Sequence, residues 1–221
     1  MTIAGILFAV MMTIMIFFLV INSFHSILLM CAVPELWSHW QLADDEYFHA
    51  LVGTDALPPI SVIASLQHSP LPPVEIAAML LGLDYPRFEV ILVVDGAAEN
   101  SLGNLVAALQ LYEVPPAFTI NVRTQPVRAY YRSRTYPRLL CIDMPDTSVG
   151  DALNAAINAA RYPHAVAAGP NVVFERDALL RLSRPFLLDR SVACASGILR
   201  PVSGAELRDG KITLRRGRGW V

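Results

Sequence analysis

The segment that decides the fold is PPISVIASLQHSPLPPVEIAAMLLGLDYPRFEVILVVD, residues 58–95. It contains two short apolar runs, 60–66 and 88–94, and the residues between them, about 74–83, have the apolar spacing of a helix. Two strand-like runs joined by a helix predict a βαβ unit, and therefore two parallel strands. Asp95 ends the segment. Because ligands of open α/β sheets bind at the carboxyl ends of the strands, Asp95 is a candidate binding residue.

The same patterns predict further elements in the second half of the chain. We expect helices at 101–112, 149–162 and 176–188, and strands at 118–127, 139–143 and 192–199. A hairpin turn is predicted at 209–211, which read Asp-Gly-Lys. The order of these elements predicts one α/β domain over residues 58–221, with a mostly parallel sheet.

The N-terminal part of the chain is different, because residues 3–21 are almost continuously apolar and the apolarity resumes at 27–33. About 20 apolar residues cross a bilayer as a helix, so a membrane anchor is predicted over 1–34. The alternative, a cleaved signal peptide, lacks a basic beginning and a clear cleavage site. We expect residues 35–57 to form an acidic linker between the membrane anchor and the domain. No Lys or Arg precedes Arg87, so flanking charge gives no orientation.

Charge and cysteine content restrict the possible partners. All 17 basic residues lie from Arg87 onward, which suits a phosphate-bearing ligand. They form no dense run, so no nucleic-acid partner is expected. The cysteines Cys31, Cys141 and Cys194 are odd in number and have no metal-ligand spacing. We expect them to be buried free thiols in a reducing compartment.

Five short motifs resemble the family 2 glycosyltransferases, membrane-attached enzymes that extend polysaccharides from nucleotide sugars. The motifs are Ser61-Val62-Ile63, Leu83-Asp84-Tyr85-Pro86, Phe88-Glu89-Val90-Ile91, Asp151-Ala152-Leu153-Asn154 and Glu175-Arg176-Asp177-Ala178-Leu179. The resemblance covers about residues 58–215. It implies the GT-A fold, a Rossmann-like nucleotide-sugar half with a mostly parallel sheet, preceded here by one transmembrane helix.

The resemblance also implies four nucleotide-binding residues, which are Gln67, His68, Asp95 and Asp151. Gln67 and His68 lie in the loop that helps to hold the base, and Asp95 lies where the family contacts the uracil ring. Structural roles are the alternatives: His68 as an exposed loop residue, Asp95 as a helix cap and Asp151 as a stabilising first-turn acid. The Gly-Gly-Lys that precedes Asp151 in the family, and suits a diphosphate, is replaced by Thr-Ser-Val.

Family members bind Mg²⁺ or Mn²⁺ through an Asp-x-Asp motif, which falls here on Gly169-Pro170-Asn171. The cation neutralises charge that develops on the departing nucleotide. Gly169 supplies no side chain, and Asn171 supplies only a neutral carbonyl oxygen. We therefore expect no metal ion, no cofactor and no catalytic residue in this chain.

These losses predict a membrane-anchored glycosyltransferase-like protein that is catalytically impaired or inactive alone, since the acceptor half of the family is also missing. One alternative is an active inverting enzyme that transfers sugar from a UDP-sugar and is completed by a partner chain. Another is an assembly module that binds no nucleotide. The expected partners are the lipid bilayer, a UDP-sugar and a full-length membrane glycosyltransferase. The implied location is the bacterial inner membrane, single-pass, with the domain in the cytoplasm.

Overall fold

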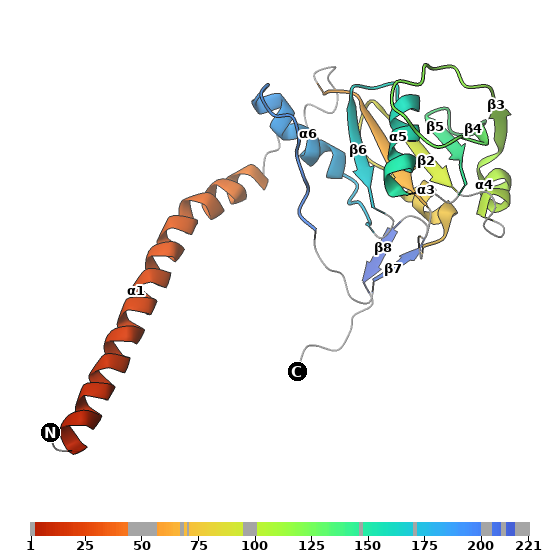
Figure 1. The fold of residues 1–221 in the computed structure, drawn as a ribbon. Coiled ribbons are helices and arrows are strands. Elements are labelled where there is room, and N and C mark those ends of the chain that lie inside the picture. Colours follow the sequence, from red (N-terminus) through yellow and green to blue (C-terminus); the bar gives the residue numbers. More distant parts are fainter. Residues whose placement is uncertain are drawn as a thin grey trace. The chain divides into compact units, whose positions relative to one another are not determined.

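The computed structural model describes residues 3–43, 57–66, 69, 71–94, 101–145, 148–169, 172–199, 205–208 and 211–214. The chain divides into two compact units, 1–50 and 51–221, and each is described by itself. The first unit contains the helix α1, and the second contains a sheet with its covering helices (Figure 1).

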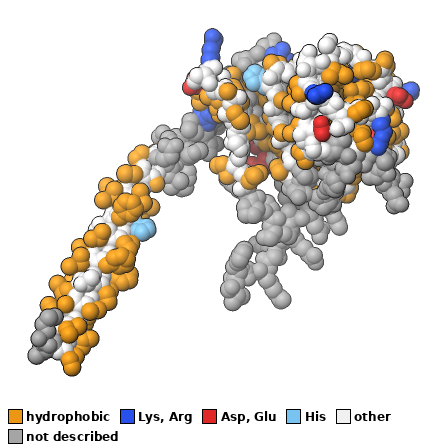
Figure 2. All heavy atoms as spheres, in the orientation of Figure 1, with side chains coloured by type: hydrophobic (Ala, Val, Ile, Leu, Met, Phe, Trp, Pro, Cys, Tyr) orange, Lys and Arg blue, Asp and Glu red, His pale blue; other side chains and the backbone are white. Residues whose placement is uncertain are grey.

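The helix α1 (Ile3–Ala43) contains a segment, Ile3–Pro34, that is long and apolar enough to cross a membrane. Its 32 residues extend about 48 Å, more than the roughly 30 Å of a bilayer's hydrocarbon core. Figure 2 shows hydrophobic side chains along its visible face. The side chains of Thr13, Asn22 and Ser26 each donate to the carbonyl oxygen four residues earlier, at 2.8–2.9 Å. Such bonds satisfy polar groups where water is absent.

The second unit is built on a six-stranded sheet with the order β3-β4-β5-β2-β1-β6. Its central strands β1 and β2 pair in parallel, as predicted, and all their residues are buried. β5 pairs in parallel with β2, and β6 with β1, whereas β4 and β3 are antiparallel additions. The strands are β1 (Ile60–Ser65), β2 (Phe88–Val94), β3 (Leu111–Val114), β4 (Ala129–Ser133), β5 (Leu139–Asp143) and β6 (His164–Ala168). The predicted α/β class with a mostly parallel sheet is confirmed.

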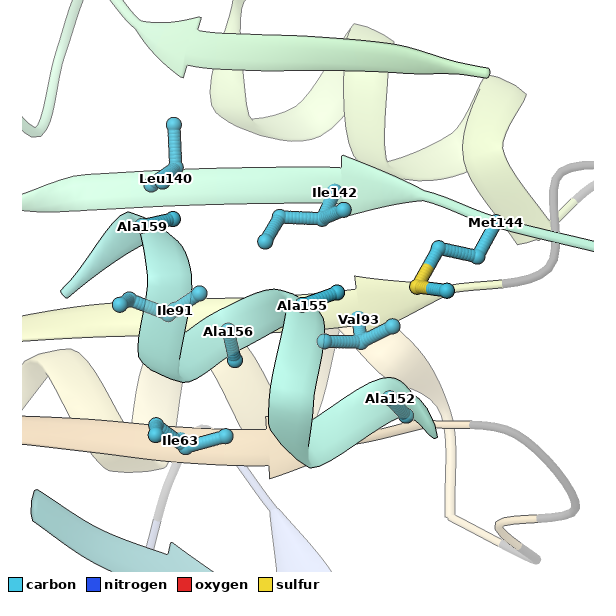
Figure 3. Close-up of a cluster of buried hydrophobic side chains, with 10 residues drawn as sticks. All are labelled: Ile63, Ile91, Val93, Leu140, Ile142, Met144, Ala152, Ala155, Ala156 and Ala159. Carbon is cyan, nitrogen blue, oxygen red and sulfur yellow. The ribbon is translucent and has the colours of Figure 1, made fainter. Parts of the chain in front are cut away.

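Four helices accompany this sheet: α3 (Pro73–Leu81), α4 (Ser101–Leu109), α5 (Val149–Ala159) and α6 (Ala178–Leu188). α5 lies in front of the sheet in Figures 1 and 3, and α3 and α4 lie behind it. α3 begins with Pro73, whose fixed φ suits the first position of a helix. Beside β6, the ring of Phe186 in α6 contacts the ring of His164, with 5.3 Å between centroids.

One hydrophobic cluster joins α5 to the sheet (Figure 3). Its fully buried members from α5 are all alanines, which are small enough to let the helix lie close to the strands, and the partly buried Leu153 packs beside them. The strands contribute branched aliphatic side chains from β1, β2 and β5. The buried members are Ile63, Ile91, Val93, Leu140, Ile142, Met144, Ala152, Ala155, Ala156 and Ala159.

A buried carboxylate fixes the amino end of the sheet. Oε1 of Glu89 on β2 accepts hydrogen bonds from the Ser61 hydroxyl of β1 at 2.7 Å and from the backbone N–H of Arg161 at 2.6 Å. The Arg161 guanidinium lies 3.7 Å from the other carboxylate oxygen. Two strands and the turn that follows α5 are thereby held together by one side chain.

The predicted strand at 118–127 is wrong, because this segment is a loop between β3 and β4. Side chains of α5 bind its backbone: Asn158 Oδ1 accepts from the N–H groups of Asn121 and Val122 at 2.9 and 2.8 Å. Figure 1 shows the loop crossing α5. The helix predicted to reach Tyr112 ends at Leu109, since Gln110 has a φ of 49° and Tyr112 belongs to β3.

The predicted strand at 192–199 is also wrong, since none of these residues pairs within a sheet. Strand-like composition forms a strand only where an edge accepts it. Cys194 in this segment is exposed, as is Cys31, so the expectation of a buried thiol holds only for Cys141. The strands β7 (Ala205–Arg208) and β8 (Lys211–Leu214) pair antiparallel, but residues 209–210 of the turn predicted at 209–211 lie outside the described chain.

We predict that Glu89→Ala lowers the free energy of unfolding by about 2–4 kcal/mol, because buried hydrogen-bond donors lose their acceptor. The matched control is Glu113→Ala on the exposed strand β3, for which a change within about 0.5 kcal/mol is expected. Chemical denaturation of the full chain in detergent measures both. Equal losses in the two variants would show that the Glu89 contacts are unimportant.

The thiol of Cys141 is predicted to resist alkylation. Burial, with a smaller effect of Asp143, raises the pKa of Cys141 to about 12. The thiolate is the reactive form, so at pH 8 Cys141 stays protonated in the folded protein. Iodoacetamide should label the exposed Cys194 in the native state and Cys141 only after unfolding, as read by mass spectrometry. Comparable labelling of both thiols in the folded protein would contradict this prediction.

Candidate functional site

The order of the parallel strands defines a candidate site. Among the parallel strands, β2 and then β5 lie on one side of β1, whereas β6, the next parallel strand in the chain, lies on the other side of β1. Such a reversal is a switch point, and ligands of open α/β sheets bind there, outside the carboxyl ends of the strands. The candidate site is therefore the carboxyl edge of the sheet around β1 and β6.

The residues predicted to bind a nucleotide follow strands that end at this edge. Of these, Gln67 and His68 come directly after β1 in the sequence and Asp95 comes after β2; Asn171, at the position of the degenerate metal motif, comes after β6. Because these strands are parallel, their described carboxyl ends lie at the same edge of the sheet. The four residues themselves lie outside the described chain. Asp151 lies within it, in the first turn of α5.

Gly169 is the first residue after β6, and its surroundings bear on the expected loss of the metal site. Ala168 lies opposite Ala64 of β1, so Gly169 stands at the level of Ser65. A Cβ added to Gly169 would lie 3.3 Å from Cγ2 of Val172. Because glycine has no side chain, position 169 supplies no carboxylate oxygen that could bind a divalent cation. In the part of the chain that the structure describes, no three His, Cys, Asp or Glu side chains could together hold a metal ion.

Asp151 takes part in capping α5. The hydroxyl of Ser148, the N-cap residue, accepts a hydrogen bond from the Asp151 N–H at 3.1 Å and donates to the Asp151 carboxylate at 2.9 Å. The Asp151 carbonyl accepts from Thr124 of the loop across α5, at 3.0 Å. The structural alternative considered for Asp151, a stabilising acid in the first turn, therefore has direct support. Its predicted contact with a nucleotide stays a prediction.

Ser65 is a polar residue of this edge that sequence analysis did not single out. It is the last residue of β1 and is only 6% exposed, and its hydroxyl oxygen has no hydrogen-bond partner among the residues that the structure describes. Buried hydroxyls are normally paired, so an unpaired one at the carboxyl end of β1 marks a position where a hydrogen-bond partner is missing. The available signal was a serine at the last position of a mostly apolar strand.

Arg128 and Asp143 form an ion pair at the same edge of the sheet, and their pairing was also missed. Asp143 ends β5, and its carboxylate lies 3.2 Å from a guanidinium nitrogen of Arg128. The Arg128 N–H also donates to the Asp143 carbonyl at 2.8 Å. The Arg128 side chain is 41% exposed and that of Asp143 only 10%. The pair closes the loop that crosses α5 and gives this edge a partly exposed cation.

Comparison with known proteins gives no assignment. No protein-family model matches this chain, and no curated protein matches it. The resemblance to glycosyltransferases is therefore a hypothesis that depends on the short motifs themselves.

We predict that Ser148→Ala lowers the free energy of unfolding by about 1 kcal/mol, because α5 loses its N-cap hydrogen bond. Ser148→Thr keeps the hydroxyl and should stay close to the wild type, which makes it the matched control. Thermal and chemical unfolding of the full chain report both changes. If the alanine and threonine variants behave alike, the hydroxyl is not the stabilising group.

Proposed function

We propose that this chain is a membrane-anchored, glycosyltransferase-like protein that is catalytically impaired on its own and keeps part of a nucleotide site. The observation that carries the proposal is the glycine at position 169. It follows β6 at the switch point of the sheet, where the resemblance expects the first carboxylate of the metal site. Without a cation, charge on a departing nucleoside diphosphate is not neutralised there.

A residual nucleotide site is supported by the edge around Gly169. The Ser65 hydroxyl is buried and has no hydrogen-bond partner in the described part of the chain, and the resemblance expects Asp95 to contact uracil from the end of the neighbouring strand. The amino end of α5 begins at this edge, and helix amino ends favour anions. Val149, the first residue of α5, stands in place of the lysine that the family directs at a diphosphate. We therefore propose weak, metal-independent binding of a UDP-type ligand.

The membrane attachment is supported by the apolar segment Ile3–Pro34 of α1. We propose that this segment anchors the protein as a single-pass helix in a bacterial inner membrane. The cytoplasmic orientation of the domain is carried over from the resemblance alone. A full-length membrane glycosyltransferase is the proposed partner, since it would supply the metal-binding carboxylates that Gly169 and Asn171 do not provide.

The deciding measurement is a calorimetric titration of the full chain in detergent with UDP, with and without Mn²⁺. We expect weak binding that Asp95→Ala reduces and that Mn²⁺ does not strengthen. The variant Gly169→Asp with Asn171→Asp should gain affinity for UDP in the presence of Mn²⁺, because it restores two carboxylates. Gly169→Asn has nearly the same size without the charge, and it should gain nothing.

Two outcomes would contradict the proposal. The first is evidence of activity: either Mn²⁺ strengthens UDP binding to the wild-type chain tenfold or more, which is about 1.4 kcal/mol or more, or the chain turns over a sugar nucleotide and this activity disappears in Asp95→Ala. Either would favour an active enzyme completed by a partner. The other is the absence of any UDP binding, which would favour an assembly module without a nucleotide site.

A further inference from the structure

The two edge strands of the sheet are protected to different degrees. Exposed edges usually carry charges, prolines or bulges, which prevent pairing with other chains. β3 has only four residues, includes Glu113, and its Tyr112 ring lies 5.6 Å from the guanidinium carbon of Arg134. β6 reads His-Ala-Val-Ala-Ala and contains neither a Lys, Arg, Asp or Glu nor a proline. In the described chain, β6 pairs only with β1.

The face of β6 beside α5 is also open. Ala167 lies opposite Ile63 of β1, and Ile63 belongs to the cluster under α5, so both residues point to the α5 side of the sheet. Ile63 is buried, whereas Ala165 and Ala167 are exposed. α5 therefore does not extend over β6. Parallel strands are normally covered on both faces, so this strand is unusually accessible.

We propose that two copies of this chain associate through the free edges of their β6 strands, which pair antiparallel about a two-fold axis. Full overlap of the strands centres the register on Val166. Ala165 of one copy then lies opposite Ala167 of the second copy, and the two sheets become one continuous sheet. This inference is independent of the nucleotide site proposed above.

A second copy suits this edge for several physical reasons. The backbone groups of an unpaired strand are complementary to themselves in the antiparallel arrangement, and two-fold interfaces are the commonest kind in soluble oligomers. The strand has no formal charge except on a protonated His164, which would lie opposite Ala168, so like charges do not meet. On the α6 side, exposed Leu187 and Leu188 follow the Phe186 ring that contacts His164, and they add apolar area.

Disulfide formation tests the register. Val166→Cys is placed in the full chain with Cys31→Ser and Cys194→Ser, which remove the exposed thiols and leave the buried Cys141. Opposite residues of antiparallel strands have Cα atoms about 4.5–5.5 Å apart, within the range of a disulfide. We expect most of the protein in detergent to form a covalent dimer under mild oxidation. Failure to cross-link would overturn this register.

Charge exchange at two exposed positions tests the interface itself. Ala165→Lys with Ala167→Lys sets like charges opposite each other twice, and should raise the dimer dissociation constant by about tenfold or more. Ala165→Glu with Ala167→Lys alters the same positions but sets opposite charges together, and should retain the dimer. Light scattering of the detergent-solubilised full chain gives the masses, and circular dichroism confirms the fold.

Three results would contradict the proposal. The first is a wild-type chain that is a monomer at micromolar concentration. The second is a dimer that stays intact in the double lysine variant, which would show that association occurs elsewhere, for example through α1. In a chain that keeps Cys194, Val166→Cys would form an internal disulfide with Cys194, which would show that the chain's own segment covers the edge.

Discussion

The parallel pairing of β1 with β2, six residues in register from Ile60 and Phe88 to Ser65 and Val93, is the contact on which the rest of the domain depends. Both strands are buried on both faces, so helices must cover the sheet from two sides. Parallel strands also need crossover connections, and these connections carry the helices. One pairing therefore imposes the layers of the fold and brings the carboxyl ends of the strands to a single edge.

The motifs that resemble glycosyltransferases hold the framework. Ser61 and Glu89 hydrogen-bond to each other, and the Tyr85 hydroxyl donates to the Pro58 carbonyl at 2.6 Å. Asn154 of α5 donates to the carbonyl of Arg123 in the loop that crosses the helix, at 3.0 Å. The departures from the family, Gly169 among them, follow the carboxyl ends of the strands. Framework and site use different residues, so the fold can persist while the chemistry at the edge changes.

Sequence reasoning failed where a distant element decides the local structure. The residues of the loop over α5, 118–127, alternate as in a strand. Its backbone is nevertheless bound by the side chains of Asn154 and Asn158, which are more than thirty residues away in the chain. No local pattern reports such a contact. The segment 192–199 has strand-like composition but pairs with no strand in the described chain. The Arg128–Asp143 pair was missed for the same reason, because it joins a loop to a strand across the sheet edge.

The sequence by itself determined the apolar helix α1, the central β1–α3–β2 unit and the α/β class, because runs of apolar residues and helical spacing are local properties of the chain. Only the tertiary structure decided which strands became neighbours, that β6 returns to the far side of β1, and that Ser65 is buried with no hydrogen-bond partner among the described residues. These outcomes depend on pairing and packing between residues that are far apart in the chain, and local patterns carry no information about them.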